Sequence, residues 1–525
     1  MEYLITLDLG TTSVKTSLFN QHLDCVSSYT EEYQLITDES TIVELPPETY
    51  WTACANGILH VTGQGTLLAP ETLADSNSIA EQLPHSNLDV SKIKSISIST
   101  QGETLIPVDA EGKALANAIV WLDARATKEA EQLKELICSD DFFKTTGLPE
   151  IGSASPICKL MWIKNNLPDV YDKTDKFLLL EDYIILKLTG QFVTEPTNMS
   201  STGYLNTRDN EIWTDCLLAA GIDPKKIPQL VPAGTIVGNI KPEAAEATGL
   251  SINTVVNTGA NDQICSAIGT GNIKPGSITE TTGTALAVVS TTDSLPEQNL
   301  YNVTFSRHIN DKFIMIAYSQ TSGIIYKWFK DNFCEDNLVD NKTGPSCPYA
   351  RLNELARIIP RGSDGLLLLP YFAGKLSPDY NENAKGVFYG LELGHTKGHF
   401  VRAIMEGIAC MLRENMEIAY ALCGETDCVI STGGAAKSPL WSQIKADMTN
   451  KSVHTAFNEG SSLGAAILGA VCNGWFQSIE EACDASIKIA KNYQPENEAV
   501  LIYQSVYQRY LQLYECLAPL FGTAQ

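Results

Sequence analysis

The sequence predicts an α/β protein with two large domains, and three observations support this prediction. Apolar runs at 4–7 and 14–19 flank a short polar turn, and a segment of the same design recurs at 277–289. Apolar residues spaced three and four apart predict helices between such runs, most clearly over 398–422. A chain of 525 residues also exceeds what one hydrophobic core usually holds, so we expect two domains.

The first half alternates strands with helices. Short runs rich in β-forming residues predict strands at 4–7, 14–19, 93–99, 177–180 and 254–256. Residues 128–137 predict a helix between them. Residues 60–92 carry Gly, Pro, Ser and Asn without clear periodicity, so we expect a long surface excursion there.

The second half begins near the connection 269–275, which contains Gly and Pro. We therefore expect an N-terminal domain over 1–270 and a C-terminal domain over 271–525. Long helices are expected at 398–422 and 496–517, with apolar stripes that serve core packing. No apolar run approaches the roughly 20 residues needed to span a bilayer, so we expect no membrane association.

The turn between the first two strands has the composition of a phosphate-binding turn. Gly10 and the hydroxyl residues 11–13 follow Asp8 at the tip of a tight hairpin. Backbone N–H groups and hydroxyls at such a tip suit phosphate oxygens, and Asp8 would place a carboxylate beside a magnesium ion on those phosphates. An ordinary β-hairpin with a polar tip explains this segment alone equally well.

Two further turns make the phosphate interpretation more specific. The segment 277–289 has Thr-Gly-Thr at 282–284 where the first hairpin has Leu-Gly-Thr at 9–11. A Gly-Gly-Ala turn at 433–435 follows another apolar run and leads into a helical stretch. Paired hairpins could clamp one triphosphate from both sides, and the Gly-Gly turn would let a flat base lie against the backbone.

Charge and cysteine content argue against several classes of protein. The formal net charge of −25, from 62 acidic and 37 basic residues, disfavours a nucleic-acid partner and is explained by solubility. The 14 cysteines form no C-x-x-C pair, and several lie in apolar runs, so we expect reduced thiols in a cytoplasmic protein without a signal peptide. The first strand is not followed by G-x-G-x-x-G, which disfavours a dehydrogenase.

Six ordered motifs resemble the FGGY carbohydrate kinases. They are Asp-Leu-Gly-Thr-Thr at 8–12, Pro-x-x-Lys-Leu-x-Trp-Ile-x-Asn-Asn at 156–166, Gly-Ala-Asn-Asp-Gln at 259–263, Thr-Gly-Thr at 282–284, Gly-Val-Phe-Tyr-Gly-Leu at 386–391 followed by 399–407, and Gly-Gly-Ala at 433–435. The resemblance spans about residues 3–475. It implies two ribonuclease-H-like domains of the actin/hexokinase type, an N-terminal sugar-binding and a C-terminal ATP-binding domain, with an interdomain catalytic cleft.

The resemblance assigns Asp262 as the catalytic base, which accepts the proton of the substrate hydroxyl as that oxygen attacks the γ-phosphate. Phosphoryl transfer depends mostly on positioning and charge neutralisation. We expect a carboxylate with an ordinary pKa of about 4, ionised at neutral pH. Without the resemblance, Asp262 would be interpreted as a turn-stabilising residue.

The resemblance also implies ATP and Mg²⁺ as cofactors. Asp8 and Asp262 would hold Mg²⁺, in the case of Asp8 through water, because Mg²⁺ keeps much of its hydration shell. The residues assigned to ATP are Gly10, Thr11, Thr12, Ser13, Lys15, Gly283, Thr284, Gly323, Lys327, Gly433, Gly434, Ala435 and Ser438. Each hydroxyl in this set could instead cap a turn or a helix.

The sugar side departs from the relatives that the chain resembles. Residues 101–104 read Gln-Gly-Glu-Thr, where glycerol kinases have Gln-Arg-Glu-Thr and xylulokinases have Gln-Met-His-Gly. Trp-Leu-Asp-Ala-Arg at 121–125 is similar to xylulokinase-type members, and Ser153 and Ala154 occupy the region of a substrate-contacting tyrosine in glycerol kinases. The implied substrate-binding residues are Gln101, Glu103, Trp121, Asp123, Asn261 and Asp262.

Gly102 in place of arginine predicts a pocket larger than one for glycerol. We therefore expect a small sugar or polyol as substrate, first a pentulose such as xylulose. Glycerol, erythritol, another pentulose or pentitol, and a hexonate stay open. A non-catalytic or chaperone-like ATP-binding relative is an alternative of another class, disfavoured because Asp262 and the sugar residues are intact. The resemblance is compatible with a homodimer.

Overall fold

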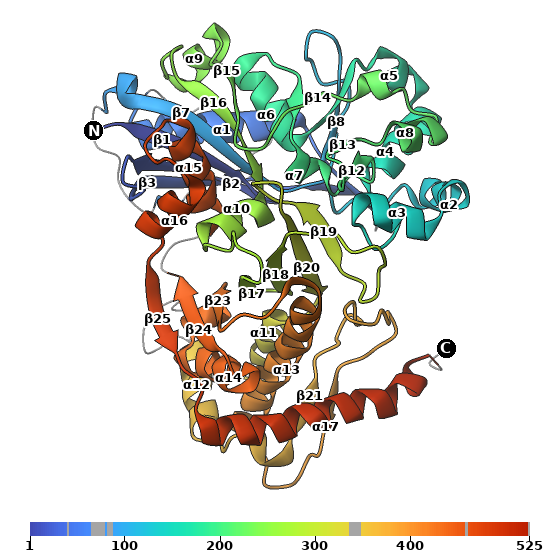
Figure 1. The fold of residues 1–525 in the computed structure, drawn as a ribbon, viewed down its shortest axis with the longest axis vertical. Helices are drawn as coiled ribbons and strands as arrows, with labels where there is room; N and C mark the ends of the chain where they lie inside the picture. The colour runs from blue at the N-terminus through green and yellow to red at the C-terminus, as the bar shows by residue number, and fades with distance from the viewer. Residues whose placement is uncertain (39–40, 65–78, 81–87, 335–347, 457–459, 523–525) are drawn as a thin grey trace.

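The molecule has two lobes stacked along the long axis of Figure 1. This computed structural model describes residues 1–38, 41–64, 79–80, 88–334, 348–456 and 460–522. The upper lobe contains most of the first half of the chain and the lower lobe most of the second half. Each lobe is built around a seven-stranded sheet, which confirms the expected α/β class.

The upper sheet has the strand order β15-β16-β7-β1-β2-β3-β6. Strand β1 pairs antiparallel with β2 and parallel with β7, so the expected N-terminal hairpin is confirmed. The strands are β1 (Tyr3–Leu9), β2 (Ser13–Asn20), β3 (Cys25–Glu32), β6 (Ile79–Ala80), β7 (Ile93–Thr100), β15 (Ile236–Asn239) and β16 (Val255–Asn261).

The lower sheet repeats this arrangement with the order β19-β20-β18-β17-β23-β24-β25. Strand β17 pairs antiparallel with β18 and parallel with β23, as β1 does with β2 and β7. The two cores therefore share the topology expected of ribonuclease-H-like domains. The strands are β17 (Ile278–Thr282), β18 (Leu286–Thr292), β19 (Thr304–Arg307), β20 (Phe313–Ser319), β23 (Cys428–Thr432), β24 (Ser452–Ala456) and β25 (Ile489–Tyr493).

Smaller sheets and the helices surround these cores. The remaining strands are β4 (Ile36–Asp38), β5 (Ile42–Leu45), β8 (Leu105–Val108), β9 (Ala118–Ile119), β10 (Lys176–Leu179), β11 (Val193–Thr194), β12 (Leu205–Asn206), β13 (Glu211–Ile212), β14 (Gln229–Leu230), β21 (Leu367–Leu369) and β22 (Val387–Tyr389). The helices of the first half are α1 (Pro47–Thr62), α2 (Thr127–Leu136), α3 (Ser139–Thr146), α4 (Pro156–Asn166), α5 (Pro168–Lys173), α6 (Leu180–Thr189), α7 (Pro196–Met199), α8 (Thr214–Ala219), α9 (Pro242–Thr248) and α10 (Asp262–Gly269).

The helices of the second half are α11 (Gly323–Phe333), α12 (Pro348–Arg357), α13 (Lys397–Cys423), α14 (Pro439–Thr449), α15 (Gly460–Cys472), α16 (Ile479–Ser486) and α17 (Asn497–Phe521). The helices expected at 128–137, 398–422 and 496–517 are thus confirmed as α2, α13 and α17. The apolar stripe of α13 lies in the core of the lower lobe, as expected. Most of the excursion expected at 60–92 lies outside the described residues.

Helix α15 belongs to the second half of the chain but lies in the upper lobe. Figure 1 shows it, with α16, beside the strands of the upper sheet. It packs on β1, β7 and β16 and, most extensively, on α10. A Cβ atom on Gly464 would lie 1.8 Å from the carbonyl oxygen of Cys265, so the two helix backbones are in direct contact. The division of the chain into 1–270 and 271–525 stays a prediction. In the folded molecule, α15 comes from the second part of the chain and packs in the upper lobe.

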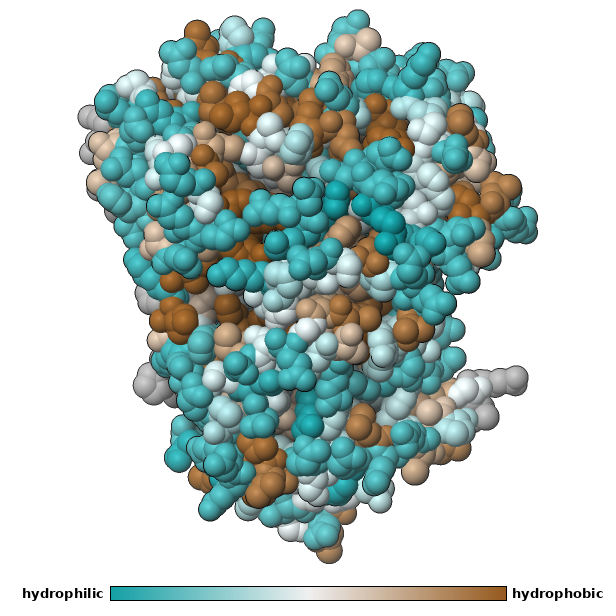
Figure 2. Space-filling view, in the orientation of Figure 1, coloured by the Kyte–Doolittle hydropathy of each residue, from teal (hydrophilic) through white to brown (hydrophobic). Residues whose placement is uncertain are grey.

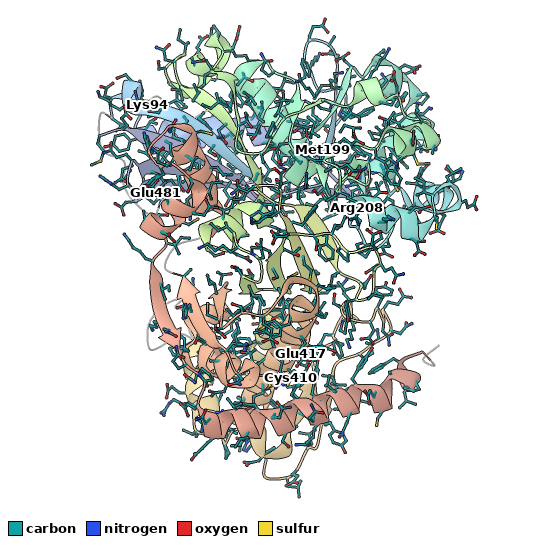
Figure 3. All side chains as sticks on the ribbon, in the orientation of Figure 1. Lys94, Met199, Arg208, Cys410, Glu417 and Glu481 are labelled. Carbon is teal, nitrogen blue, oxygen red and sulfur yellow. The ribbon has the colours of Figure 1, made fainter. Side chains whose placement is uncertain are left out.

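The two lobes also contact each other near α3 of the upper lobe and β19 of the lower lobe. Arg208 donates to the carbonyl oxygen of Pro296 at 3.2 Å and pairs with Glu297 at 3.3 Å. Figure 3 shows Arg208 at the boundary of the lobes. The backbone N–H of Phe305 donates to the carbonyl oxygen of Gly147 at 2.8 Å. These contacts join the lobes on one side of the space between them.

The surface in Figure 2 is largely hydrophilic, with hydrophobic side chains scattered among polar ones. Within the described ranges, no helix combines the length and the hydrophobicity that a membrane span requires. Every cysteine in that part of the chain is free.

Candidate active site

Two neighbouring cavities lie between the lobes, each of about 570 Å³. The first cavity is lined by the tips of both hairpins, including Asp8, Gly10, Ser13, Lys15, Gly283 and Thr284. The second cavity is lined by residues of both lobes, including Gln101, Glu103, Trp121, Asn261, Thr304 and Ser377. Four residues line both cavities: Asp262, Gln263, Ala287 and Tyr318.

Asp262 is the titratable residue at the junction that suits proton transfer at neutral pH. It is the first residue of α10 and directly follows β16. Asn261 caps this helix, because its Oδ1 accepts a hydrogen bond from the N–H of Gln263 at 3.0 Å. A side chain placed here can reach a group in either cavity.

The expectation of an ordinary pKa for Asp262 is wrong. Burial, and after it the negative charge of Asp8, raises the pKa of this carboxyl to about 7, against hydrogen bonds from Gln263 that lower it. The sequence-based value belongs to an isolated carboxyl in water, whereas two carboxyls share this site. A cation bound beside them would favour the ionised form.

Asp8 is the next-to-last residue of β1, and two hydroxyls donate to its carboxylate. Ser99 Oγ donates to its Oδ1 at 3.0 Å, and Ser461 Oγ donates to its Oδ2 at 2.5 Å. In the described part of the chain, no group of three or more His, Cys, Asp and Glu residues could hold a metal ion. Two carboxylates, Asp8 and Asp262, therefore fit Mg²⁺ only together with phosphate oxygens and water, which is the donor set that Mg²⁺ prefers with nucleotides.

The first hairpin is closed by a hydrogen bond from the Gly10 N–H to the Ser13 carbonyl oxygen at 2.9 Å. The buried Tyr33 donates its hydroxyl to the carbonyl oxygen of Gly10 at 2.6 Å. Gly10 and Ser13 line the first cavity with Lys15, as a phosphate role requires. Thr11 lines the second cavity instead, and Thr12 is exposed and lines neither.

The second hairpin is supported by contacts from α11 and α14. Gly323 donates its N–H to the carbonyl oxygen of Gly283 at 2.8 Å, and a Cβ atom on Gly323 would lie 2.4 Å from that oxygen. Lys445 Nζ lies 2.5 Å from Glu280 Oε1 and donates to Thr282 Oγ1 at 2.9 Å. Both charged side chains are fully buried. This ion pair ties α14 to the base of the hairpin.

The third turn joins β23 to α14 through residues 433–438. Ser438 caps α14, because its Oγ accepts a hydrogen bond from the N–H of Trp441 at 3.3 Å. Lys327 pairs with Asp331 at 2.5 Å on the exposed face of α11. Among the described lining residues of the two cavities, none belongs to this turn and none is Lys327. Adenosine contacts by Gly433, Gly434, Ala435, Ser438 and Lys327 stay predictions.

Four of the expected substrate residues line the second cavity beside Asp262: Gln101, Glu103, Trp121 and Asn261. Gln101 donates through Nε2 to the Tyr50 hydroxyl at 3.4 Å, and its buried Oε1 has no partner among the described residues. An amide oxygen in this state suits a substrate hydroxyl donor. Glu103 has a φ of 67°, a left-handed conformation that non-glycine residues rarely adopt.

Lys159 is buried beneath this loop and comes from the expected 156–166 motif. Its Nζ donates to the carbonyl oxygens of Glu103 at 3.2 Å and Val120 at 3.0 Å. It thereby joins the two chain segments that carry Glu103 and Trp121. Burial raises the pKa of Glu103 to about 7, while the charge of Lys159 opposes that rise.

Asp123 does not have the expected position in the sugar site. It lines neither cavity, is fully buried, and accepts hydrogen bonds from Arg125 NH2 at 2.7 Å and from the N–H of Val43 at 2.6 Å. These partners satisfy its carboxylate, so it supports the fold behind Trp121. Likewise, Pro149 and Glu150 line the second cavity in place of Ser153 and Ala154.

Several lining residues were not expected from the sequence. Ser461 is 453 positions from Asp8, and Tyr318 lies near the end of a largely apolar strand. No local signal marks either residue, because their roles arise only from the meeting of α15 and β20 with the upper lobe. Gln263 adjoins Asp262 and could have been found from that position.

The charged residues that line the second cavity are all acidic. They are Glu103, Glu150 and Asp262, and the described lining residues include no Lys or Arg. The first cavity differs, since Lys15 lies on its wall beside Asp8.

Two family models match the chain. The N-terminal domain of the FGGY family of carbohydrate kinases matches residues 3–269, and the C-terminal domain of the same family matches residues 277–472. The chain is 31% identical to a xylulose kinase of Bacillus subtilis (strain 168), over 98% of this chain and 97% of the relative. It is 30% identical to a gluconokinase of the same organism, over 92% and 90%.

Solved structures share the fold across the whole length. A ligand-bound xylulose kinase from Lactobacillus acidophilus has a TM-score of 0.84 at 25% identity, with 99% of each chain covered. A gluconate kinase from Lactobacillus acidophilus has a TM-score of 0.85 at 24% identity, again with 99% of each chain covered.

Proposed function

From the premise that this chain belongs to the FGGY family of carbohydrate kinases, we propose that its substrate is a neutral pentulose such as xylulose. The enzyme is a phosphotransferase with an alcohol group as acceptor and ATP as phosphate donor. Mg²⁺ as the accompanying cation belongs to the proposal.

The acidic lining of the second cavity supports a neutral substrate. The relatives include kinases named for xylulose, which is neutral, and for gluconate, which carries a carboxylate. A hexonate would bring its negative charge next to Glu150 and next to Glu103 and Asp262, which are partly ionised at neutral pH because their pKa values are about 7, and no described lining residue offers a guanidinium or an ammonium group. Like charges in a partly desolvated cavity repel, so a hexonate is disfavoured.

Glycerol and erythritol are the remaining neutral alternatives. The cavity of about 570 Å³ lies within the usual range for small-molecule sites and has room for more than three carbons. Gly102 lines this cavity, and a Cβ atom there would lie 3.0 Å from Ser201 Oγ and 3.1 Å from Asn261 Nδ2. The volume of the cavity therefore supports a five-carbon substrate over glycerol.

The mechanism that we propose uses Asp262 as the base at the junction of the cavities. Its carboxylate accepts the proton of the substrate hydroxyl as that oxygen bonds to the γ-phosphorus, and the bond from this phosphorus to the β–γ bridging oxygen breaks to release ADP. Donors on both hairpins, including the hydroxyls of Ser13 and Thr284, bind the phosphate oxygens. Asp8 and Asp262 would hold Mg²⁺, which supplies charge neutralisation when bound.

Other parts of the proposal concern the protein as a whole. We propose a sugar-binding domain over 1–270 and an ATP-binding domain over 271–525. Free cysteines throughout the described residues support a cytoplasmic location. A homodimer stays a proposal from the resemblance alone. A non-catalytic relative is disfavoured because Asp262 occupies the junction of both cavities.

The experiment is ADP release with Mg-ATP across D-xylulose, D-ribulose, L-ribulose, xylitol, erythritol, glycerol and D-gluconate. We expect the highest kcat/KM with a pentulose, at least about tenfold above D-gluconate, which corresponds to about 1.4 kcal/mol of discrimination. D-gluconate as the best substrate would overturn the neutral-substrate argument.

A charge variant sharpens this experiment. Glu150 lines the second cavity and has no assigned part in the chemistry. Glu150→Gln should raise kcat/KM for D-gluconate relative to D-xylulose, because it removes one repelling charge. An unchanged ratio would mean that the acidic wall does not select against a carboxylate.

A further inference from the structure

Trp121 links the second cavity to the first hairpin. It lines the second cavity with 37% of its surface exposed, and its Nε1 donates to Thr11 Oγ1 at 2.9 Å. The two residues are 110 positions apart in the chain. The sugar-facing wall is therefore bonded directly to the tip of the phosphate turn.

We infer that Trp121 is a positioning residue that fixes the Thr11 hydroxyl as a hydrogen-bond donor at the boundary of the two cavities. This inference rests on the proposed function, because it takes the first cavity as the nucleotide cavity. It adds a physical connection by which occupancy of one cavity is felt in the other.

The direction of the hydrogen bond carries the argument. An indole N–H can only donate, so Thr11 Oγ1 must be the acceptor. A threonine hydroxyl has one hydrogen and two acceptor lone pairs, so accepting from Trp121 leaves that hydrogen to donate elsewhere. The acceptors expected at this boundary are the oxygens of a phosphoryl group or of a substrate hydroxyl.

The backbone around Thr11 is arranged to pass a displacement on. Gly10 and Ser13 flank it and line the first cavity, while Thr11 itself lines the second. The N–H of Tyr33 donates to the carbonyl oxygen of Thr12 at 2.9 Å, which holds the other side of the tip. Movement of the Trp121 ring therefore shifts a turn whose residues Gly10 and Ser13 line the first cavity.

A second route joins the same two regions. Gln101 donates to Tyr50 at 3.4 Å, the Tyr50 ring lies edge-on to the Tyr33 ring with centroids 5.2 Å apart, and Tyr33 donates to the Gly10 carbonyl oxygen. Both routes start at a residue of the second cavity and end at the tip of the first hairpin. We expect the Trp121 route to dominate, since it is a single direct hydrogen bond.

The test is a double-mutant cycle on MgADP binding, measured by isothermal titration calorimetry without any sugar. Trp121→Phe keeps an aromatic ring and removes the N–H, and Thr11→Val keeps the shape and removes the hydroxyl. We expect each variant to weaken MgADP binding by about fivefold, the effect of one hydrogen bond. The double variant should show the same fivefold loss, because both changes remove one interaction.

Two further variants separate positioning from general disturbance. Thr11→Ser, which retains the hydroxyl, should recover most of the affinity lost in Thr11→Val. Trp162→Phe is the matched control, because Trp162 packs under Arg125 in the same lobe and lines neither cavity. It should leave MgADP affinity unchanged.

The outcomes are distinct. Unchanged MgADP affinity in Trp121→Phe, or a double variant in which the two losses multiply to about 25-fold, would overturn the inference. Absence of MgADP binding by the wild-type protein would contradict the proposed function and this inference with it.

A second arm uses D-xylulose as the probe. Saturating D-xylulose should tighten MgADP binding by the wild-type protein, and Trp121→Phe should reduce that factor, because coupling between two ligands is reciprocal. If D-xylulose leaves wild-type MgADP affinity unchanged, the inferred connection between the two cavities fails, while the pentulose proposal is decided by the ADP-release experiment and the sugar-free cycle still decides whether Trp121 positions Thr11.

Discussion

The two phosphate hairpins have the same backbone design but are supported in different ways. The tip of the β1–β2 hairpin is held by Tyr33 and Trp121, which are themselves connected to the second cavity. The β17–β18 hairpin rests on the fully buried Glu280–Lys445 pair and on close backbone contact with Gly323. The first hairpin is therefore joined to the sugar site, whereas the second is anchored to the core of its own lobe.

This difference teaches how one design can serve two roles. At the position of Asp8 near the end of β1, the corresponding residue of β17 is Thr281, whose hydroxyl lies 2.8 Å from that of Thr432. The upper hairpin would thus supply the charged group for the proposed cation, and the lower one a neutral surface. We interpret the lower hairpin as the fixed side of the clamp and the upper one as the side that responds to substrate.

Asp262 lines the cavity between the two hairpins, so we expect its substitution to cause the largest loss of activity. Asp262→Asn should lower kcat by about 10²- to 10⁴-fold, because a general base contributes a factor of this size. MgADP binding, followed by calorimetry, should remain detectable because both hairpins are intact. A variant that keeps a tenth of the wild-type turnover would show that another group accepts the proton.

Breaking the anchor under the second hairpin should cost stability rather than chemistry. Lys445→Met leaves Glu280 buried without its cation, and we expect a loss of about 3–5 kcal/mol in the free energy of unfolding, measured with urea.

The double variant Glu280→Leu/Lys445→Met should recover most of that loss, because no charge is then left unpaired. By comparison, Thr11→Val at the first hairpin should cost no more than about 1.5 kcal/mol of unfolding free energy. Equal losses for Lys445→Met and Thr11→Val would remove the distinction between an anchored and a responsive hairpin.

The contact from Ser461 to Asp8 gives a smaller effect with a close control. Ser461→Ala removes a hydroxyl that donates to the Asp8 carboxylate. The Mg²⁺ concentration that ADP binding requires should rise about tenfold, which is the effect of losing one hydrogen bond to a charged group. Ser462→Ala changes the next residue of α15, whose buried Oγ has no partner among the described residues, and should have little effect. Similar losses in both variants would point to a disturbed helix instead of a lost contact.

The pH dependence should show which state of the enzyme carries the raised pKa of Asp262. With a pKa of about 7, the ionised fraction rises from about one tenth at pH 6 to about nine tenths at pH 8, so kcat/KM should rise about tenfold across this range.

The pH at which kcat rises to half of its plateau should be lower than the corresponding pH for kcat/KM. The reason is that a cation bound beside Asp8 and Asp262 favours the ionised carboxylate. Initial rates at saturating and at low substrate separate the two pH profiles. A kcat/KM that is flat between pH 6 and pH 8 would contradict the raised pKa.

The sequence predicted the features that depend on neighbouring residues. Both hairpins and the α13 stripe follow from local patterns of apolar residues, Gly and hydroxyls. The gathering of Gln101, Glu103, Trp121 and Asn261 in one cavity agrees with the roles that the resemblance implied.

Features that depend on distant partners could not be predicted. The Glu280–Lys445 pair joins residues 165 positions apart, and each residue alone looks like an ordinary surface charge. Asp123 was assigned to the sugar because the run at 121–125 resembles that of xylulokinase-type members, and only the structure shows Arg125 bound to it. The pKa of Asp262 was missed because the sequence shows neither how deeply this carboxyl is buried nor how near Asp8 lies.

The return of α15 to the upper lobe has a consequence for how the polypeptide folds during synthesis. The N-terminal sheet lacks the helix that covers β1 and β7 until residues 460–472 have left the ribosome. Until then its apolar face is exposed, and Asp8 lacks the hydroxyl of Ser461. We therefore expect the first domain to complete its packing among the last events of folding, with the long loop-closure times that such distant contacts impose.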